Sequence, residues 1–266
     1  MEGSLGCLGP CSYRERARTG RSARVSSEDH SPFDVSETSF FPIWARGEAG
    51  GYSERPFSLS SPMQPSLFDL DAPDLDRTFS RLERIHLDET AWVDVAPGWV
   101  TGSDQLFQTL AETLPWAQRT RFLYEKHRIE PRLTAGWRAG TVRPLQPPIL
   151  DEMRAALSER YGVEFDSAGF NFYRDGQDSV AWHRDKIPAR IHQPVVALVS
   201  LGEPRRFLLR PRGGGTSRPF PLGHGDLLVT GGDTQRTWEH AVLKVAHAGP
   251  RISIAFRYGM DARVYD

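Results

Sequence analysis

The sequence predicts an α+β domain that is mainly β, built as a barrel or jelly roll with helices packed on its outside. Two amphipathic helical segments precede position 162, and seven short β-type segments follow it, separated by glycine, proline and polar turns. Helices followed by closely spaced strands are typical of such folds. The chain has 266 residues, 39% of them hydrophobic, which is enough apolar material for an ordinary core.

Both helices are predicted from the period of their apolar residues. The first spans 103–114, where Ser103 can cap the N-terminus. Its apolar face holds Leu106, Phe107, Leu110 and Leu114. The second spans 148–161, begins after two prolines, and ends where Gly162 can adopt the left-handed conformation. Its apolar face holds Leu150, Met153, Leu157 and Tyr161.

The strands are predicted from short runs rich in β-branched, aromatic and aliphatic residues. They span 165–174, 179–184, 195–201, 205–210, 226–230, 237–245 and 251–258. Helical periodicity is absent after position 162, so the C-terminal part of the domain is expected to be β throughout.

The domain is expected to span 63–266, preceded by a disordered tail. Residues 1–62 contain 12 Ser, 7 Gly and 5 Pro and show no sustained helical or strand periodicity. Met63 opens a stretch with regular apolar spacing, so a misassigned start codon is the simplest explanation of the tail, and binding of a partner is the alternative.

Cysteine and apolar content predict a cytoplasmic protein without membrane spans. The two cysteines, Cys7 and Cys11, lie far upstream of the predicted domain and support neither a disulfide framework nor a zinc knuckle. No apolar run is long enough to cross a bilayer. A monomer is the simplest expectation.

The net charge is −1, so any nucleic-acid partner would have to be held by a local basic patch. All basic residues except Lys126, Lys186 and Lys244 are arginines, which suit bidentate contacts with anions. A codon bias of a GC-rich genome explains most of this excess without any function.

A metal site is predicted from three separated residues. His183 and Asp185 stand two apart at the end of a strand, so they point to the same face with about 7 Å between their α-carbons. Alone, such a pair usually marks a solvated surface contact. His240 lies 55 residues after Asp185 in a later apolar strand, where the alternative is a hydrogen-bonded core histidine. Two histidines and one carboxylate form the facial triad of non-haem Fe(II) oxygenases.

The strand over 251–257 predicts a second part of the site, which would bind an anion. Arg251, Ser253 and Arg257 alternate with apolar residues, so both arginines point into the barrel if the apolar face packs on helices. A buried guanidinium requires an anion, and a dicarboxylate would satisfy both. The alternative is an ordinary amphipathic strand facing water.

The strand over 165–174 adds hydrogen-bonding groups to the same site. Asn171 and Tyr173 share one face, opposite Phe170 and Phe172, and supply an amide and a phenol. Either group can donate a hydrogen bond to a carboxylate, although an amphipathic strand facing water is again the alternative.

Taken together, these residues resemble the AlkB family of Fe(II)- and 2-oxoglutarate-dependent dioxygenases. The motifs are N-x-Y at Asn171 and Tyr173, H-x-D at His183 and Asp185, the distal His240, and R-x-S-x3-F-R over 251–257. The resemblance covers roughly 85–260. The order and spacing of four separate motifs must coincide, which makes the joint match far more specific than any one of them.

This resemblance implies a double-stranded β-helix, a jelly-roll or cupin-like barrel with flanking N-terminal helices. It also implies a set of ligands and cosubstrate contacts. Iron would be held by His183, Asp185 and His240, and the cosubstrate by Asn171, Tyr173, Arg251, Ser253 and Arg257. Arg251 would clamp the distal carboxylate of 2-oxoglutarate and Arg257 would lie near the carboxylate at the iron. The implied reaction uses O2 to remove N-alkyl groups from bases of DNA, with RNA as an alternative substrate, releasing aldehyde, succinate and CO2.

A nucleic-acid substrate requires a base displaced from its stack, in single-stranded or locally opened DNA, together with contacts to phosphates. Trp137 falls where the family places a nucleotide-recognition loop, and a core position is equally compatible. Trp182 is next to the iron ligand His183 and so lies on the opposite face of the strand, which favours a core position. The candidate phosphate contacts are Arg205, Arg206, Arg210 and Arg212, in a run followed by three glycines. A solvated strand with a hairpin turn is the alternative.

The sequence departs from the family pattern at two positions. Ile187 stands where many DNA-repair members carry an acid that contacts the damaged base, and Ser253 stands where better-known members have asparagine. Because of Ile187, a second function stays possible for this chain, namely hydroxylation of a small molecule or a protein. A third alternative is a cupin-like module that binds zinc or nickel without turnover, against which the two inward arginines argue.

Overall fold

The computed structural model describes residues 72–123 and 126–259. All of them belong to the second of two compact units, Leu59–Asp266. The predicted tail over 1–62 therefore lies outside the described residues. In the described part of the chain, no helix is long and apolar enough to cross a membrane.

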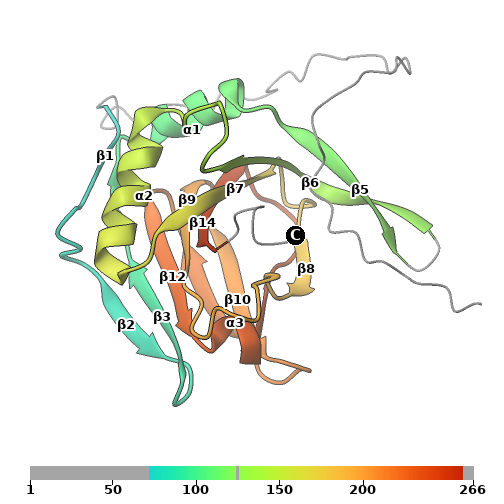
Figure 1. Ribbon diagram of the computed structural model, residues 1–266. Helices are drawn as coiled ribbons and strands as arrows, with labels where there is room; N and C mark the ends of the chain where they lie inside the picture. The colour runs from blue at the N-terminus through green and yellow to red at the C-terminus, as the bar shows by residue number, and fades with distance from the viewer. Residues whose placement is uncertain (1–71, 124–125, 260–266) are drawn as a thin grey trace, which may run out of the picture. The chain divides into compact units, whose positions relative to one another are not determined.

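The larger of the main sheets has eight strands in the order β2-β3-β12-β9-β14-β7-β6-β5 (Figure 1). Its strands are β2 (Glu83–His86), β3 (Ala91–Ala96), β5 (Ala117–Leu123), β6 (Lys126–Arg138), β7 (Phe165–Tyr173), β9 (Val196–Gly202), β12 (Asp226–Gly232) and β14 (Arg251–Tyr258). All neighbouring pairs in this sheet are antiparallel. In Figure 1, β5 and β6 extend away from the rest of the sheet.

The smaller main sheet has four antiparallel strands in the order β11-β10-β13-β8. They are β8 (Val180–His183), β10 (Arg205–Pro211), β11 (Arg218–Leu222) and β13 (Trp238–Val242). The short strands β1 (Asp74–Leu75) and β4 (Val100–Thr101) pair separately. One buried apolar cluster combines Phe207 and Leu209 of the small sheet with Val93 and Leu228 of the large sheet. The two sheets therefore face each other across a shared interior.

Two helices cover the other face of the large sheet, α1 (Ser103–Thr113) and α2 (Pro148–Tyr161) (Figure 1). The main apolar core joins their buried residues to alternate residues of β7 and β14. Its members from α1 and α2 include Leu106, Leu110, Leu150 and Met153, and those from the two strands include Phe170, Phe172, Ile252 and Ile254. The predicted alternation is confirmed, because these apolar residues face the helices and their polar neighbours face the barrel interior.

The helix ends depart from the prediction at one point. Ser103 is not the N-cap of α1, since Gly102 holds that position in the left-handed conformation and Ser103 is the first helical residue. The Ser103 hydroxyl donates to the carbonyl of Val100 instead. The prediction for α2 is confirmed at both ends, with Pro148 in the first turn and Gly162 as a left-handed C-cap.

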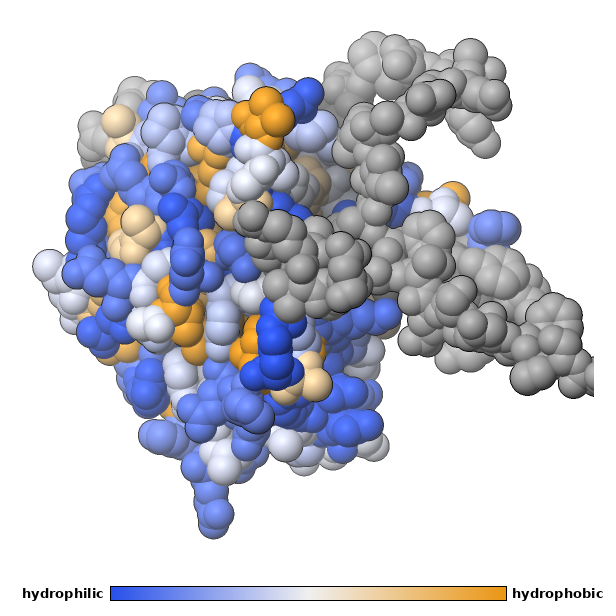
Figure 2. Space-filling view, viewed as in Figure 1, coloured by the Kyte–Doolittle hydropathy of each residue, from blue (hydrophilic) through white to orange (hydrophobic). Residues whose placement is uncertain are grey.

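Each predicted strand is present, with ends shifted by no more than a few residues. The structure adds β1, β2, β3, β4, β5, β6, β11 and the short helix α3 (Thr234–Thr237), which the sequence did not predict. The result is a double-stranded β-helix with helices outside. On the face shown in Figure 2, hydrophilic residues predominate and hydrophobic residues lie in separate small patches.

Candidate metal and cosubstrate site

The small sheet brings the two predicted histidine ligands together. His183 at the end of β8 pairs with His240 in β13, and their ring centroids lie 4.2 Å apart. Asp185 follows two residues after His183, just beyond the end of β8. Its Oδ1 atom lies 3.9 Å from Nε2 of His183 and 3.8 Å from Nε2 of His240. The three ligand atoms, one from each residue, lie within 4.8 Å of one another, which fits a single metal ion.

The second oxygen of Asp185 is already engaged. Arg257 in β14 donates from Nε to Oδ2 at 2.8 Å, which leaves Oδ1 directed at both histidines. Burial alone would raise the pKa of Asp185, but the charge and hydrogen bond of Arg257 hold it well below its ordinary value. The carboxylate is therefore ionised, which is the state that binds a cation.

Contacts around the two histidines orient one ring nitrogen of each toward the shared metal position. Burial lowers the pKa of His240 to about 3, so its imidazole is neutral at pH 7. The ring of His240 also stacks on Phe207, with centroids 5.2 Å apart. Nδ1 of His183 lies 2.8 Å from the carbonyl oxygen of Ala181, and must donate because a carbonyl only accepts. This contact leaves Nε2 of His183, the nitrogen nearer Asp185, as the ring atom available to a metal.

Arg251 forms the anion-binding part of the site. Its side chain is fully buried, and Nε donates to the hydroxyl of Ser200 at 3.0 Å. Nη1 and Nη2 have no hydrogen-bond partner among the described residues. Burial lowers the pKa of Arg251. A buried guanidinium with two unused nitrogens fits one carboxylate of 2-oxoglutarate, since a bidentate anion would satisfy both nitrogens.

The remaining predicted cosubstrate residues line the same part of the barrel. Asn171 and Ser253 are paired across β7 and β14, with Nδ2 of Asn171 3.4 Å from the Ser253 hydroxyl. The ring of Tyr173 lies under two guanidinium groups, 5.2 Å from that of Arg251 and 5.7 Å from that of Arg205. The structure thus brings all five predicted cosubstrate residues onto neighbouring strands.

Two residues of this region were missed by the sequence analysis. Arg132 in β6 donates from Nε to Oδ1 of Asn171 at 2.9 Å, and its Nη2 lies 3.0 Å from Oε2 of Glu130. Their side chains are only 13% and 9% exposed. Alternation in "IEPRLT" was the available signal, because Glu130, Arg132 and Thr134 share one face of the strand.

The four predicted phosphate contacts separate into three environments. Arg205 is buried and donates to the carbonyls of Asp175, Asp178 and Leu243, so the prediction that it contacts a phosphate is wrong. Arg210 pairs with Glu239 at 3.0 Å. Arg206 and Arg212 are exposed and stay candidates.

The two candidate tryptophans occupy positions other than a stacking platform over the site. Trp137 packs against the helix-side core, on the face of β6 opposite Thr134, and donates to the carbonyl of Arg143. Trp137 is partly buried, which favours the core alternative, and its part in substrate binding stays a prediction. Trp182 is partly exposed rather than in the core, with the guanidinium of Arg210 4.1 Å above its ring.

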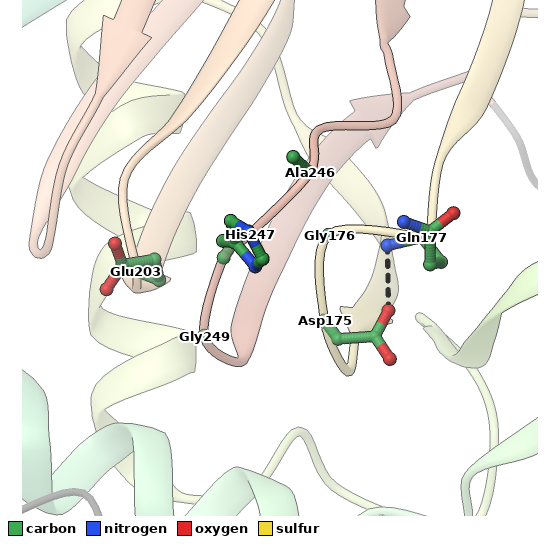
Figure 3. A pocket seen from close by; sticks show the side chains of 8 residues that line it. Asp175, Gly176, Gln177, Glu203, Ala246, His247 and Gly249 are labelled. Carbon is green, nitrogen blue, oxygen red and sulfur yellow. Dashed lines mark hydrogen bonds between the residues drawn. The ribbon is translucent and has the colours of Figure 1, made fainter.

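A separate open pocket lies among the turns β7–β8 and β9–β10 and the loop before β14 (Figure 3). Its lining includes Asp175, Glu203 and His247 and contains none of the metal triad or the inward arginines. In Figure 3 the only interaction drawn among these residues is the hydrogen bond from the Gln177 backbone to Asp175. The candidate site is therefore the barrel interior and not this pocket.

The interior of this double-stranded β-helix combines a metal triad, made of a His-x-Asp pair and a distal His, with a buried arginine that lacks an anion among the described residues. These features define a non-haem iron oxygenase that takes a carboxylate cosubstrate. The chain belongs to the 2OG-Fe(II) oxygenase superfamily, whose family model matches residues 95–257. Members of this superfamily use Fe(II), 2-oxoglutarate and O2, so the predicted cofactors are confirmed.

Relatives confirm the resemblance to the AlkB family. The chain is 34% identical over 188 residues to alpha-ketoglutarate-dependent dioxygenase alkB homolog 3 of Bos taurus, covering 62% of this chain and 65% of that protein. It is 31% identical over 190 residues to DNA oxidative demethylase ALKBH2 of Arabidopsis thaliana, covering 57% and 60%. The chain thus matches less than two thirds of either relative. The solved structure of OsALKBH1 is similar with a TM-score of 0.48 at 14% identity, covering 66% of this chain and 99% of that chain.

Proposed function

We propose that this protein is an Fe(II)- and 2-oxoglutarate-dependent demethylase that removes N-alkyl groups from damaged bases in DNA, with RNA as a further substrate. The observation that carries the proposal is the buried Arg251, whose two unpartnered nitrogens lie in the same barrel as the metal triad. The nucleic-acid substrate is supported by relatives named as DNA oxidative demethylases.

Each part of the site has a distinct role in this proposal. Iron and 2-oxoglutarate, when bound, supply the oxidation of an N-alkyl carbon by O2, with succinate, CO2 and an aldehyde as products. Oδ1 of Asp185 and Nε2 of both histidines would hold the metal, and the Arg257 contact keeps Oδ1 free for it. Arg251 would bind the distal carboxylate in a region closed to water. Phe207 shields the ring of His240.

A second candidate is a hydroxylase of a small molecule or a protein. Ile187 favours it, because a partly buried apolar side chain follows Asp185 where an acid would contact a methylated base. Lys186, between the two, is exposed and positively charged. A cationic base such as 3-methylcytosine would gain no charge pairing from this loop.

The experiment that tests the proposal follows the mass of a single-stranded oligonucleotide bearing 3-methylcytosine or 1-methyladenine. The protein is incubated with Fe(II), 2-oxoglutarate and air, and His183→Ala serves as the control without a metal ligand. Loss of one methylene equivalent only with the unaltered protein supports base demethylation. Slow succinate formation without any change in oligonucleotide mass would favour the second candidate. Absence of succinate under all conditions would contradict both.

A further inference from the structure

Asp185 depends on a residue outside the triad for its backbone position. The strand β8 ends at His183, so the backbone N–H of Asp185 has no partner in the sheet. That N–H donates to Oε1 of Gln235 at 3.2 Å. Gln235 belongs to the short helix α3, 50 residues further along the chain. The contact is partly buried, and a backbone N–H removed from water without an acceptor is costly, so this hydrogen bond stabilises the observed path of the chain at Asp185.

The side chain of Gln235 is itself fixed. It is 5% exposed, and its Nε2 donates to the hydroxyl of Thr230 at 3.1 Å. The Thr230 hydroxyl in turn donates to the carbonyl of Val196 at 3.4 Å. Because a backbone N–H only donates, the amide oxygen must face Asp185 and the amide nitrogen must face Thr230. The network therefore permits one orientation of the Gln235 amide.

Asp185 is consequently held from two sides. Gln235 accepts from its backbone, and Arg257 donates to Oδ2 of its carboxylate at 2.8 Å. With both ends fixed, Oδ1 is placed between the two histidines at 3.9 and 3.8 Å. Loss of the backbone contact would free the segment that carries the carboxylate even with Arg257 in place.

The helix α3 also connects the two segments that carry metal ligands. Its next residue, Arg236, donates to the carbonyls of Pro188 and Ile191 in the loop after Asp185. In the other direction, α3 leads directly into β13, in which His240 follows Gln235 by five residues. A single turn of helix thus fixes the loop beyond one ligand and the start of the strand that carries another.

We propose that Gln235 is a positioning residue for the iron site, setting the backbone of Asp185 so that its carboxylate meets the metal together with His183 and His240. The inference deepens the proposed function at the same site, but it concerns the metal and not the substrate. Outer contacts of this kind typically change metal affinity by about 10–100-fold when they are removed.

The test is Co(II) binding to the full chain, measured by the visible absorption of the bound ion and without any turnover. Gln235→Met keeps the length of the side chain but removes the acceptor. We expect it to lower Co(II) affinity by at least about tenfold and to change the shape of the absorption bands. Gln177→Met, at an exposed glutamine in the distant β7–β8 turn, is the matched control and should bind as the unaltered protein does.

Gln235→Glu tests the acceptor directly. A buried, protonated glutamic acid offers the same acceptor and donor in the same shape, so this variant should recover most of the Co(II) affinity. Wild-type affinity and unchanged bands in Gln235→Met would overturn the proposal. The two proposals can fail separately. If the unaltered protein binds Co(II) and Gln235→Met weakens that binding, but no oligonucleotide is demethylated, the proposed function is contradicted and this inference stands.

A second measurement needs no variant and covers the case in which Gln235→Met does not fold. In the metal-free protein, amide hydrogen exchange should be markedly slower at Asp185 than at the neighbouring exposed Lys186. Equal rates at the two amides would show that Gln235 does not hold this N–H and would overturn the proposal.

Discussion

Arg132 donates a hydrogen bond of 2.9 Å from Nε to Oδ1 of Asn171, and this contact determines which way the asparagine amide faces. A guanidinium only donates, so the amide oxygen must point at Arg132. Nδ2 then points at Ser253, 3.4 Å away, toward the strand that carries Arg251. The amide thus offers a donor to the region in which a carboxylate would bind.

Replacement of Arg132 by methionine is therefore expected to weaken binding of 2-oxoglutarate. Without its donor the Asn171 amide can rotate, and a hydrogen bond to a charged group is worth about 1.5–3 kcal/mol. We expect the KM for 2-oxoglutarate to rise about tenfold with a smaller change in kcat. Gln177→Met, in the exposed β7–β8 turn, is the control. An unchanged KM in Arg132→Met would show that the amide is held by other contacts.

Arg251→Met is expected to make the ligand-free protein more stable while abolishing its stabilisation by 2-oxoglutarate. Replacing a buried, incompletely paired guanidinium with an apolar side chain is expected to raise the thermal midpoint of the ligand-free protein by about 2–4 °C, equivalent to about 1 kcal/mol. The unaltered protein should gain further stability from saturating 2-oxoglutarate, and the variant should not. Differential scanning fluorimetry with and without the acid measures both. A lower midpoint that still responds to 2-oxoglutarate would contradict this account of Arg251.

Arg257→Gln is predicted to weaken the metal site. Oδ2 of Asp185 loses its charged donor, so the carboxylate is free to rotate and Oδ1 is no longer directed at the histidines. We expect affinity for Mn(II) to fall about 10–100-fold, measured by titration in the absence of 2-oxoglutarate. Arg210→Gln, which removes a comparable ion pair with Glu239 on the outer face of the small sheet, should leave Mn(II) affinity unchanged.

Acid should remove the stabilising contribution of Asp178 in the turn before β8. Burial would raise its pKa, but the hydrogen bonds and charge of Arg174 bring it below the ordinary value of 3.8. A lowered folded-state pKa stabilises the fold above that ordinary value and stops doing so as pH falls through the folded-state pKa. Asp178→Asn should therefore lower the thermal midpoint at pH 7, with a difference that shrinks below about pH 4. A difference independent of pH would contradict this.

If nucleic acid is the substrate, Arg206 and Arg212 should contribute to its binding through charge alone. Replacing both with serine should weaken binding of a single-stranded oligonucleotide and reduce the slope of log affinity against log salt by about 1.4, for two phosphate contacts. Arg218→Ser, another exposed arginine with a backbone contact to His86, is the comparison variant. An unchanged salt slope would place the phosphate contacts elsewhere.

The strands that form the site were predictable because they obey a simple alternation. In β7 and β14 every second residue is apolar and packs on the helices, so the polar residues between them had to face the barrel interior. Asn171, Arg251 and Arg257 were located by that argument. The same argument, applied to β10, would have separated Arg205, which shares a face with Phe207, from the exposed Arg206.

The contacts that complete the site were not predictable from local pattern. Gln235 lies in a helix of four residues, too short for any periodicity, and meets Asp185 across 50 residues of sequence. The strand β6 was missed because its first residues, over 126–128, are all basic, although apolar and polar residues alternate from Ile129 onward. The Gln235 contact depends on tertiary pairing, which local propensity does not encode.

The buried guanidinium of Arg251 has a consequence for how the enzyme responds to its surroundings. The distal carboxylate of 2-oxoglutarate is unchanged in succinate, so this end of the pocket cannot distinguish the spent acid from the fresh one. Discrimination between them is left to the end near Asp185 and Arg257. We therefore expect succinate to compete with 2-oxoglutarate at Arg251, so that turnover falls as succinate accumulates relative to 2-oxoglutarate.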